Sequence, residues 1–553
     1  MSTRFTKSEI NKPRTKNRGP VVTGQPRPDP AVAATDGISP KAWWIGVIVI
    51  MAIGTVLRLY DLNLVPLHHD EGVNGNFLVR LVREGVYQYD PQNYHGPTLY
   101  YFAALIPALT KLLFGADARE NYGLTTFTIR LVPALFGLAT IGLVLLLRRR
   151  LGAIATLAAG LMLAVSPGAV YLSRYFIHET LFVFFTLGIV VAAVWFYDER
   201  NPAYLIPAAA CAALLFATKE TAMISVGVLI IALFMTLGYM RLNAGTVRTP
   251  GGKRKQSPTG FSEVLHQFDA SGLLFGIGMA VVVFLGLYLL LYSSFFTNNK
   301  GISDSLQTFA IWTKTGTVAH VHPPTTYLTW LISQESPLLL LGVVGAAFVV
   351  LKPKNATALF CALWSFGLIA AYSLIPYKTP WLMLNFIVPL ALIAGYVVQE
   401  LYELSRADWR LASMVLLLAI GVAVYQSIDL NFINYDNDDQ KYVYVYAHTR
   451  RGLLDLVNQV EQIARERSGD ETGITIVSPD YWPLPWYFRN FNRVGYFSGM
   501  AASSEPMIIA NVSQKQQMEA NFGGSYRLVP SKENDGAFEL RPGVRLLLYL
   551  RRS

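Results

Sequence analysis

The feature that most constrains the fold is a long central stretch with very few charged residues. Between residues 42 and 429, only 43 of 388 positions are Asp, Glu, Lys or Arg. Soluble domains carry about 25% charged residues. A stretch this long and this poor in charge excludes a soluble protein. We therefore predict a polytopic α-helical membrane protein with a transmembrane domain over 42–429.

The two ends of the chain have other compositions. Residues 1–41 hold 8 basic and 3 acidic side chains without apolar periodicity, which predicts a disordered basic cytoplasmic tail. Residues 430–553 hold 14 basic and 14 acidic side chains, an ordinary value for a soluble domain. A helical pattern over 447–466 predicts a small C-terminal extracytoplasmic α/β domain, with three candidate strands. These strands are 474–478, 526–529 and 544–550. Because this domain is neutral, we expect no nucleic-acid partner.

Twelve apolar runs divide the central stretch. They are 42–60, 97–114, 127–147, 151–172, 178–197, 203–218, 221–240, 271–297, 337–351, 356–375, 381–401 and 410–429. Basic clusters at 148–150, 241–255 and 352–354 should share the cytoplasmic side with the basic tail. They do so only if 97–114 does not cross the bilayer. We therefore predict eleven full spans, within a range of about 11–13 transmembrane helices, and place 97–114 at the outer interface.

Ionisable residues collect at the predicted outer ends of the spans, where they are rarely found without a function. They lie in the loop 61–96, in two short turns, in the loop 298–336 and near residue 378. The candidates are His69, Asp70, Glu71, His95, Arg174, Glu179, Lys219, His320, His322 and Lys378.

Carboxylates beside cations at a membrane surface suit sugar transfer from a polyprenyl-phosphate donor. Such a donor has its lipid in the bilayer and its sugar outside. A carboxylate can take the proton of an acceptor hydroxyl, and fixed positive charge can stabilise the departing phosphate. We expect Asp70 to be the base, with Arg174 and Lys219 near the phosphate. The alternatives are a solvated loop Asp or helix cap at 70, and membrane snorkelling of the two cations.

Several motifs resemble those of the GT-C glycosyltransferases that use lipid-phosphate sugars, such as protein O-mannosyltransferases and lipid A aminoarabinose transferases. They are His69-Asp70-Glu71, His95-Gly96-Pro97, the segment 130–137, Ser173-Arg174-Tyr175 and Thr218-Lys219. The family has His/Lys-Pro-Pro where this chain has Gly96, which is a departure at the middle position. The segments 68–71, 377–381 and 481–487 are similar to those of a prokaryotic subfamily described as flippase-activity-associated.

The resemblance implies a GT-C-like fold and roles for the candidates. Asp70 and Glu71 would be catalytic, with Glu71 orienting groups or binding the acceptor. The donor phosphate would meet Arg174, Lys219, His95, Lys378 and His322, while His69, Glu179 and His320 are further candidates. Glu179 could instead pair with Arg174 or Lys219 as a structural contact.

The predicted activity is inverting transfer of a hexosyl or mannosyl unit on the outer face of the plasma membrane. The partners are membrane lipid, a polyprenyl- or dolichyl-phosphate sugar, and a glycan, lipid or protein acceptor hydroxyl. We expect no cofactor, and a divalent metal is the less favoured alternative because adjacent His68 and His69 diverge. A flippase-associated or lipid-linked-sugar-binding protein without transferase activity is the alternative function. Clean span centres favour the enzyme, because transporters carry buried charge at mid-span.

Overall fold

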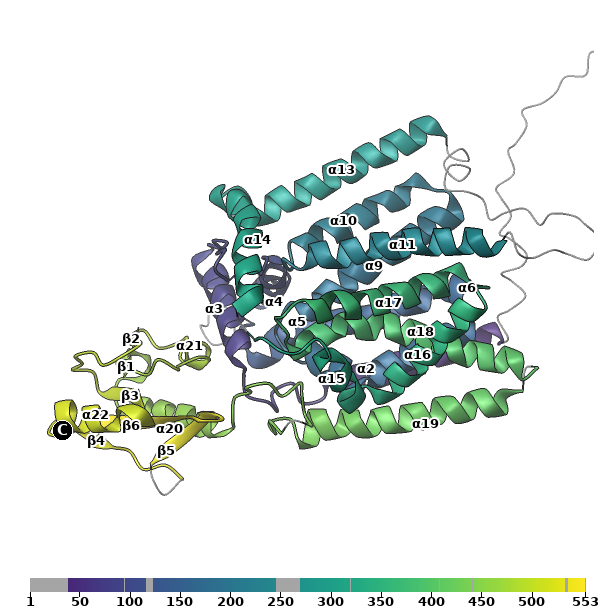
Figure 1. The fold of residues 1–553 in the computed structure, drawn as a ribbon. Helices are drawn as coiled ribbons and strands as arrows, with labels where there is room; N and C mark the ends of the chain where they lie inside the picture. The colour runs from purple at the N-terminus through teal and green to yellow at the C-terminus, as the bar shows by residue number, and fades with distance from the viewer. Residues whose placement is uncertain are drawn as a thin grey trace, which may run out of the picture.

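The structure is a computed structural model that describes residues 38–93, 95–115, 123–244, 269–318, 320–406, 408–439, 441–532 and 536–552. It contains a bundle of long apolar helices with a smaller domain at one end (Figure 1). Within the described residues, eight helical segments are long and apolar enough to cross a membrane. They are α2 (Pro40–Leu59), α5 (Thr126–Leu146), α9 (Glu179–Glu199), α11 (Ala222–Ala244), α13 (Ala270–Tyr292), α17 (Ala356–Leu374), α18 (Leu384–Leu404, extended by η2, Pro380–Met383) and α19 (Trp409–Ile428, extended by η3, Asp429–Ile433).

Two further spans are broken into helix pairs. α7 (Ala153–Val165) and α8 (Pro167–Ser173) meet at 60°, and α15 (Thr326–Gln334) and α16 (Ser336–Leu351) meet at 115°. A proline at the start of α8 lacks the N–H needed to continue the preceding helix. The two breaks touch, because the Glu335 carboxylate accepts hydrogen bonds from the Ser166 hydroxyl at 2.9 Å and the Gly168 N–H at 2.8 Å. This contact ties the broken spans together.

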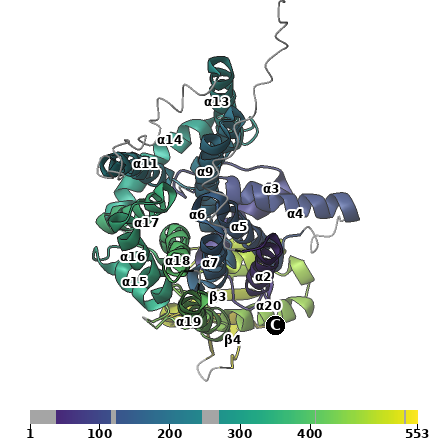
Figure 2. The ribbon, with the colours of Figure 1, turned by 90° about the vertical axis from the view of Figure 1, so that its right-hand side faces the viewer.

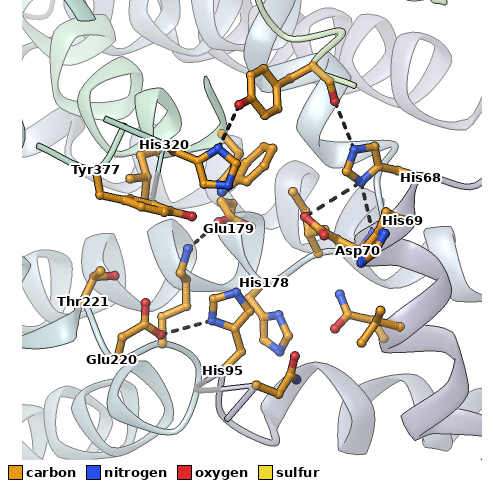
Figure 3. A pocket seen from close by; sticks show the side chains of 18 of the residues that line it. His68, His69, Asp70, His95, His178, Glu179, Glu220, Thr221, His320 and Tyr377 are labelled. Atoms are coloured by element: carbon orange, nitrogen blue, oxygen red, sulfur yellow. Dashed lines mark hydrogen bonds and ion pairs between the residues drawn. The ribbon is translucent and has the colours of Figure 1, made fainter. Parts of the chain in front are cut away.

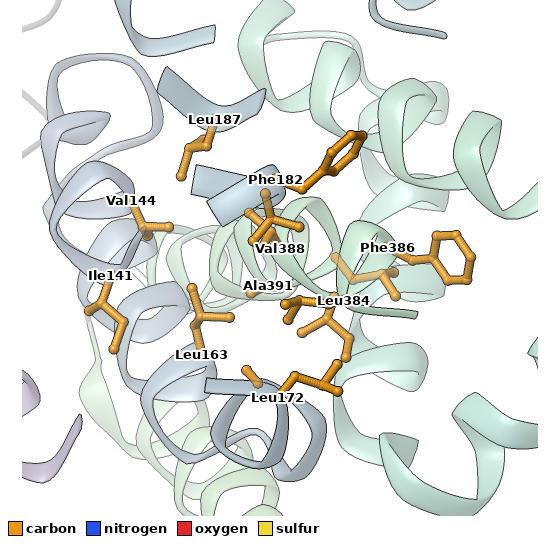
Figure 4. Packing of buried hydrophobic residues seen from close by; sticks show 14 of the residues in the cluster. Ile141, Val144, Leu163, Leu172, Phe182, Leu187, Leu384, Phe386, Val388 and Ala391 are labelled. Atoms are coloured by element: carbon orange, nitrogen blue, oxygen red, sulfur yellow. The ribbon is translucent and has the colours of Figure 1, made fainter. Parts of the chain in front are cut away.

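The central element is α18. Its most apolar window is 94% buried, whereas that of the peripheral α13 is only 6% buried. Figure 4 shows large aliphatic and aromatic side chains of α18 packed among those of α7, α8 and α9, on which α5 packs in turn. The labelled residues are Ile141, Val144, Leu163, Leu172, Phe182, Leu187, Leu384, Phe386, Val388 and Ala391. Burial of α18 by its neighbours explains why it is apolar on all sides.

The helix α4 (Thr98–Phe114) does not carry the chain across the bundle. The Arg148 guanidinium, after α5, lies 4.3 Å from the Trp43 ring at the start of α2. The start of α2 and the end of α5 therefore lie on the same side, so α2 crosses the bundle in one direction and α5 crosses back. Figures 1 and 2 accordingly show α4 running crosswise to the long helices, beside α3 (His69–Glu84).

Lys352 and Lys354 lie at this same end of the bundle, where α11 also ends, whereas residues 245–255 of the predicted basic cluster 241–255 lie outside the described residues. The Asn355 side chain donates to the Arg150 carbonyl at 2.6 Å, and the Tyr239 hydroxyl donates to the Val350 carbonyl at 2.7 Å. The short α6 (Arg148–Leu151), α10 (Leu205–Phe216) and η1 (Pro202–Tyr204) complete this part of the bundle. The described residues give eight spans, or ten when each broken helix pair counts as one span, and α10 is shorter than these. The count of eleven full spans stays a prediction.

The C-terminal domain lies at the opposite end, as Figure 1 shows. Its strands have the order β2-β1-β3-β6-β4, and β5 also pairs with β6. The strands are β1 (Ile474–Ile476), β2 (Val494–Tyr496), β3 (Met507–Asn511), β4 (Tyr526–Leu528), β5 (Ala537–Arg541) and β6 (Val544–Arg551), accompanied by α20 (Gly452–Arg465), η4 (Gly469–Glu471), α21 (Leu484–Tyr487), η5 (Val512–Gln514) and α22 (Lys515–Phe522). This confirms the predicted small α/β domain, although the sequence analysis missed β2, β3 and β5. The predicted outer loop 298–336 contains α14 (Lys300–Val318) and α15.

Candidate active site

A cavity of about 500 Å³ lies at the end of the bundle that faces the C-terminal domain (Figure 3). Residues from nine separate parts of the chain line it, including the start of α3, the turn before α4 and the turns before α9 and α11. Its charged and imidazole-bearing lining residues are His68, His69, Asp70, His95, His178, Glu179, Lys219, Glu220, His320 and Arg541. The mixture of carboxylates, one lysine and several imidazoles distinguishes this cavity from the apolar interior.

Asp70 faces the cavity from the first turn of α3. Its backbone N–H donates to Nδ1 of His68 at 3.1 Å, and Nε2 of His68 lies 3.1 Å from the Tyr446 carbonyl oxygen. Nδ1 must therefore accept and Nε2 must carry the proton, which makes the His68 ring neutral. The Asp70 carboxylate lies 3.8 Å from Nδ1, and 42% of its side chain is exposed. Because Nδ1 carries no hydrogen, it donates no hydrogen bond to this carboxylate. It remains available as a proton acceptor.

Glu71 points the other way, into the protein, and is fully buried. Its two oxygens accept from Nε and Nη2 of Arg130 at 2.7 and 2.6 Å, from the Phe176 N–H at 2.8 Å and from the His68 N–H at 3.0 Å. Arg130 also donates to the carbonyls of Leu62, Val65 and Pro66. This bidentate pair holds the loop before α3 and so fixes the position of Asp70.

Two acid–base pairs form the opposite wall. The Lys219 ammonium donates to Glu179 at 2.5 Å, and Nδ1 of His95 donates to Glu220 at 3.1 Å. Burial alone would lower the pKa of Lys219, but the carboxylates of Glu179 and Glu220 raise it above its ordinary value. Burial would also raise the pKa of Glu220, but His95 and Lys219 hold it below its ordinary value. Lys219 is therefore a permanent positive charge at the cavity wall.

The segment that carries His95 is joined to Lys219 through its backbone. The Gly96 N–H donates to the Thr218 carbonyl at 3.0 Å, and a Cβ at residue 96 would lie 2.0 Å from the Ala217 carbonyl oxygen. Proline could neither donate this hydrogen bond nor fit this contact. The departure from the family motif at Gly96 thus has a structural reason, because it brings the two segments into direct contact.

His178 completes this wall. Its Nε2 lies 3.1 Å from the Gly96 carbonyl oxygen, so Nε2 donates and Nδ1 can only accept. Burial and the nearby His95 lower the pKa of His178 well below its ordinary value, so the ring stays neutral. Within the described part of the chain, Nδ1 has no hydrogen-bond partner. A bound hydroxyl would satisfy it.

The loops at 320–322 and 376–378 close the third side. Val321 and Tyr377 form an antiparallel bridge, and Nδ1 of His320 lies 2.8 Å from the Tyr446 hydroxyl. Burial lowers the pKa of His320, which keeps its ring neutral at pH 7. The loop thereby links the end of the bundle to the segment that leads into the C-terminal domain.

Comparisons with known proteins agree with this architecture. The family model described as dolichyl-phosphate-mannose-protein mannosyltransferase matches residues 95–248. The structure is similar to ArnT from Cupriavidus metallidurans, with a TM-score of 0.60 for the apo state and 0.59 for the form bound to undecaprenyl phosphate. Each match has 14% sequence identity and covers 92% of this chain and 98% of ArnT. It is also similar to the oligosaccharyltransferase AglB from Archaeoglobus fulgidus in complex with an inhibitory peptide and a dolichol-phosphate, with a TM-score of 0.52, 14% identity, and coverage of 86% of this chain and 70% of AglB.

The chain is a GT-C-fold membrane protein. The match to ArnT decides this, because it spans the transmembrane domain and the C-terminal domain together. The fold predicted from the sequence motifs is therefore confirmed. No curated protein sequence matches the chain.

The GT-C fold brings most of the predicted site residues together. Asp70, His69, His95, Glu179, Lys219 and His320 all line the cavity. Glu179 pairs with Lys219, one of the two partners expected from the sequence. Glu71 lies behind the wall and supports it through Arg130, which fits its expected orienting role and not a contact with the acceptor.

Three predicted phosphate ligands lie outside the cavity. The Arg174 guanidinium donates to the carbonyls of Leu57, Arg58, Tyr60 and Asp61 and covers the Phe432 ring at 4.8 Å. Lys378 is fully buried, and its ammonium donates to the Ser373 and Ile375 carbonyls. The His322 ring packs against Trp330. These side chains hold helix ends and loops in place, and their contact with the donor phosphate stays a prediction.

Four charged or imidazole-bearing lining residues were absent from the predicted set, namely His68, His178, Glu220 and Arg541. Glu220 and His178 directly neighbour Lys219 and Glu179 in sequence, so their proximity was a usable signal. Arg541 comes from β5 of the C-terminal domain and had no local signal. Among the residues that the structure describes, no group of three or more His, Cys, Asp or Glu side chains is placed to hold a metal ion.

Proposed function

We propose that this protein is a membrane glycosyltransferase that moves a sugar from a polyprenyl- or dolichyl-phosphate donor to an acceptor hydroxyl. We place the reaction on the outer face of the plasma membrane, with the basic N-terminal tail in the cytoplasm. ArnT and AglB have this fold and were solved with undecaprenyl phosphate and dolichol-phosphate bound, which supports the donor class. The sugar is proposed to be a hexose of the mannosyl type, in line with the family model that matches residues 95–248.

The observation that carries the proposal is one cavity with an available carboxylate on one wall and two acid–base pairs on the opposite wall. Asp70 faces the cavity from α3, and Lys219 with His95 faces it from the turns before α11 and α4. The cavity opens where an apolar helix bundle ends, so a lipid chain can stay in the bilayer while its phosphate reaches Lys219. Asp70 and Lys219 thus stand where acceptor and leaving group would enter.

In the proposed step, the carboxylate of Asp70 takes the proton from the acceptor hydroxyl. The acceptor oxygen attacks the anomeric carbon while the bond from that carbon to the phosphate oxygen breaks. The lipid phosphate leaves with the electron pair, and Lys219 and His95 stabilise its charge. A single displacement of this kind inverts the anomeric centre.

We also propose that sugar transfer by this protein requires no metal ion. Both ring nitrogens of His68 are engaged by Asp70 and Tyr446, and Nδ1 of His95 is engaged by Glu220. These imidazoles would have to break existing hydrogen bonds before they could bind a metal. Transfer should accordingly persist in excess EDTA, and loss of transfer that added Mn²⁺ restores would refute this part.

A second candidate is a protein that binds or helps to flip lipid-linked sugars without transferring them. The pairing of Lys219 with Glu179 favours this second candidate, because it leaves few charged side chains of the cavity wall without a partner. The available Asp70 carboxylate favours the transferase, because binding alone has no need of a base.

The test is sugar transfer in membranes of a host that lacks the protein. Radiolabelled polyprenyl-phosphate sugars are supplied, and wild type is compared with Asp70→Asn. Asp90→Asn is the matched control, because Asp90 lies in the same loop, is exposed and caps the Gln92 N–H with an oxygen that Asn retains.

Transfer by wild type and Asp90→Asn, with little by Asp70→Asn, is the expected result. Equal transfer by all three would leave the enzyme and remove Asp70 as its base. Absence of transfer by all three, with donor and acceptor shown to be present, would support the second candidate.

A further inference from the structure

One wall of the cavity belongs to the C-terminal domain. Arg541, at the end of β5, lines the cavity together with Asp70 and His69. Its Nη2 donates to the carboxylate of Asp480, and the two side chains are 20% and 38% exposed. This pair is therefore fixed but still open to a ligand, unlike the fully buried pair of Glu71 and Arg130.

The segment that carries Asp480 is held tightly against the start of α3. A Cβ at Gly72 would lie 2.5 Å from Cβ of Pro483, and a Cβ at Gly75 would lie 2.5 Å from the Trp486 ring. The Tyr487 hydroxyl accepts from the Leu67 N–H at 2.9 Å. Trp486 and Tyr487 thus serve to dock the domain, and they place the segment one helical turn from Asp70.

Trp482 has a different position in the same segment. It is half-buried, and its ring lies against that of His69 with the centroids 6.1 Å apart. Burial lowers the pKa of His69, although Asp70 raises it in part, so this ring is neutral at pH 7. At this edge of the cavity, the lining residues His69 and Arg541 therefore contact the indole of Trp482 and the carboxylate of Asp480, and the Arg541–Asp480 pair has zero net charge.

This combination fits a saccharide. Sugar hydroxyls both donate and accept, and Asp480 offers acceptors beside the donors of Arg541. The apolar face of a sugar ring packs on an aromatic face such as that of Trp482. The Asp480–Arg541 pair offers no net charge that would select an acidic or a basic peptide.

We propose that Asp480, Arg541, Trp482 and His69 form an acceptor subsite, and that the acceptor of the transfer is a glycan and not a protein side chain. This inference rests on the proposed transferase function, since it assigns the acceptor of that same site. The C-terminal domain then presents the glycan hydroxyl to Asp70.

The first experiment measures binding, which does not depend on transfer. Saturation-transfer NMR on the detergent-solubilised full chain is recorded with mannobiose, maltose and chitobiose. Wild type is compared with Arg541→Gln, Trp482→Leu and the control Arg493→Gln. Arg493 forms a similar pair with Glu505 in the same domain, but it lies outside the cavity lining. Melting temperatures confirm that each variant is folded.

At least one saccharide should bind wild type and Arg493→Gln, and it should bind Arg541→Gln about tenfold or more weakly, as expected for loss of a charge-assisted hydrogen bond. Trp482→Leu should weaken it as well. Binding of no saccharide by wild type, or equal binding by the Arg541 and Arg493 variants, overturns the inference.

The second experiment separates this inference from the transferase proposal. In the transfer assay, Arg541→Gln should raise the KM for a saccharide acceptor while the KM for the donor stays unchanged. Transfer by wild type to Ser/Thr peptides but not to saccharides would overturn the glycan subsite and leave the enzyme in place. Saccharide binding without any transfer would retain the subsite and refute the transferase.

Discussion

Substitution of Glu71 tests whether this residue supports the site or takes part in the chemistry. Its carboxylate is fully buried and accepts four hydrogen bonds, two from Arg130 and one each from the N–H groups of His68 and Phe176. In Glu71→Gln, one acceptor oxygen becomes an NH₂ group that faces two donors. Breaking a buried pair by changing one partner costs about 3–5 kcal/mol. We expect the free energy of unfolding to fall by about this amount.

The assay is thermal and denaturant unfolding of the purified chain in detergent, followed by intrinsic fluorescence. Glu84→Gln is the matched control, because Glu84 ends the same helix and forms an exposed pair with Arg80 at 3.9 Å. Such a surface pair is worth about 0–1 kcal/mol. The double variant Glu71→Gln/Arg130→Met should recover part of the lost stability, because it leaves no buried charge unpaired.

A Glu71→Gln variant that melted like wild type would show that the Glu71–Arg130 pair does not stabilise the fold. A variant that keeps its stability but loses sugar transfer would move Glu71 from the support of the cavity into the reaction itself. A double variant less stable than Glu71→Gln would also contradict the assigned pairing.

Three further predictions concern other parts of the site. Gly96→Ala should lower stability by about 1–3 kcal/mol, the usual cost of overpacking, because its Cβ would press on a backbone carbonyl. Gly142→Ala, inside α5 and with open space around it, should not lower the melting temperature. The pKa of Glu220 lies below its ordinary value of 4.5, so its stabilising contribution is present above that pH and is lost as pH falls through the lower, folded-state pKa. The melting temperature of wild type should therefore fall more steeply below about pH 4.5 than that of Glu220→Gln. Parallel curves of melting temperature against pH would contradict this. His95→Gln should reduce kcat/KM for the donor by about tenfold or more, as for loss of a hydrogen bond to a charged phosphate, whereas Arg174→Gln should lower the melting temperature without raising the donor KM.

Composition and short motifs were sufficient to predict the transmembrane domain and much of the cavity. Low charge over 42–429 predicted the helical bundle, and basic clusters predicted that 97–114 does not cross it. Asp70 and Lys219 could be identified because ionisable residues at span ends are rare enough to stand out. Their positions in one cavity follow from the passage count, which brings alternate connections to the same end of the bundle.

The sequence could not distinguish a cation that faces the cavity from one that holds the backbone. Arg174 and Lys219 both follow an apolar run, yet Arg174 binds carbonyls at the end of α2 whereas Lys219 meets Glu179. The difference depends on how the broken span α7–α8 turns, which no local pattern encodes. Arg541 was missed for a related reason, because it reaches the cavity only through the docking of a domain more than 450 residues after Asp70.

The most direct test of the central claim is the single-turnover rate of sugar transfer by the purified chain in liposomes. Asp70→Asn and Asp90→Asn are compared with wild type at saturating donor and acceptor. Asp70→Asn should be about 10²–10⁴-fold slower, the usual contribution of a general base, and Asp90→Asn should match wild type. A rate for Asp70→Asn close to that of Asp90→Asn would contradict the account.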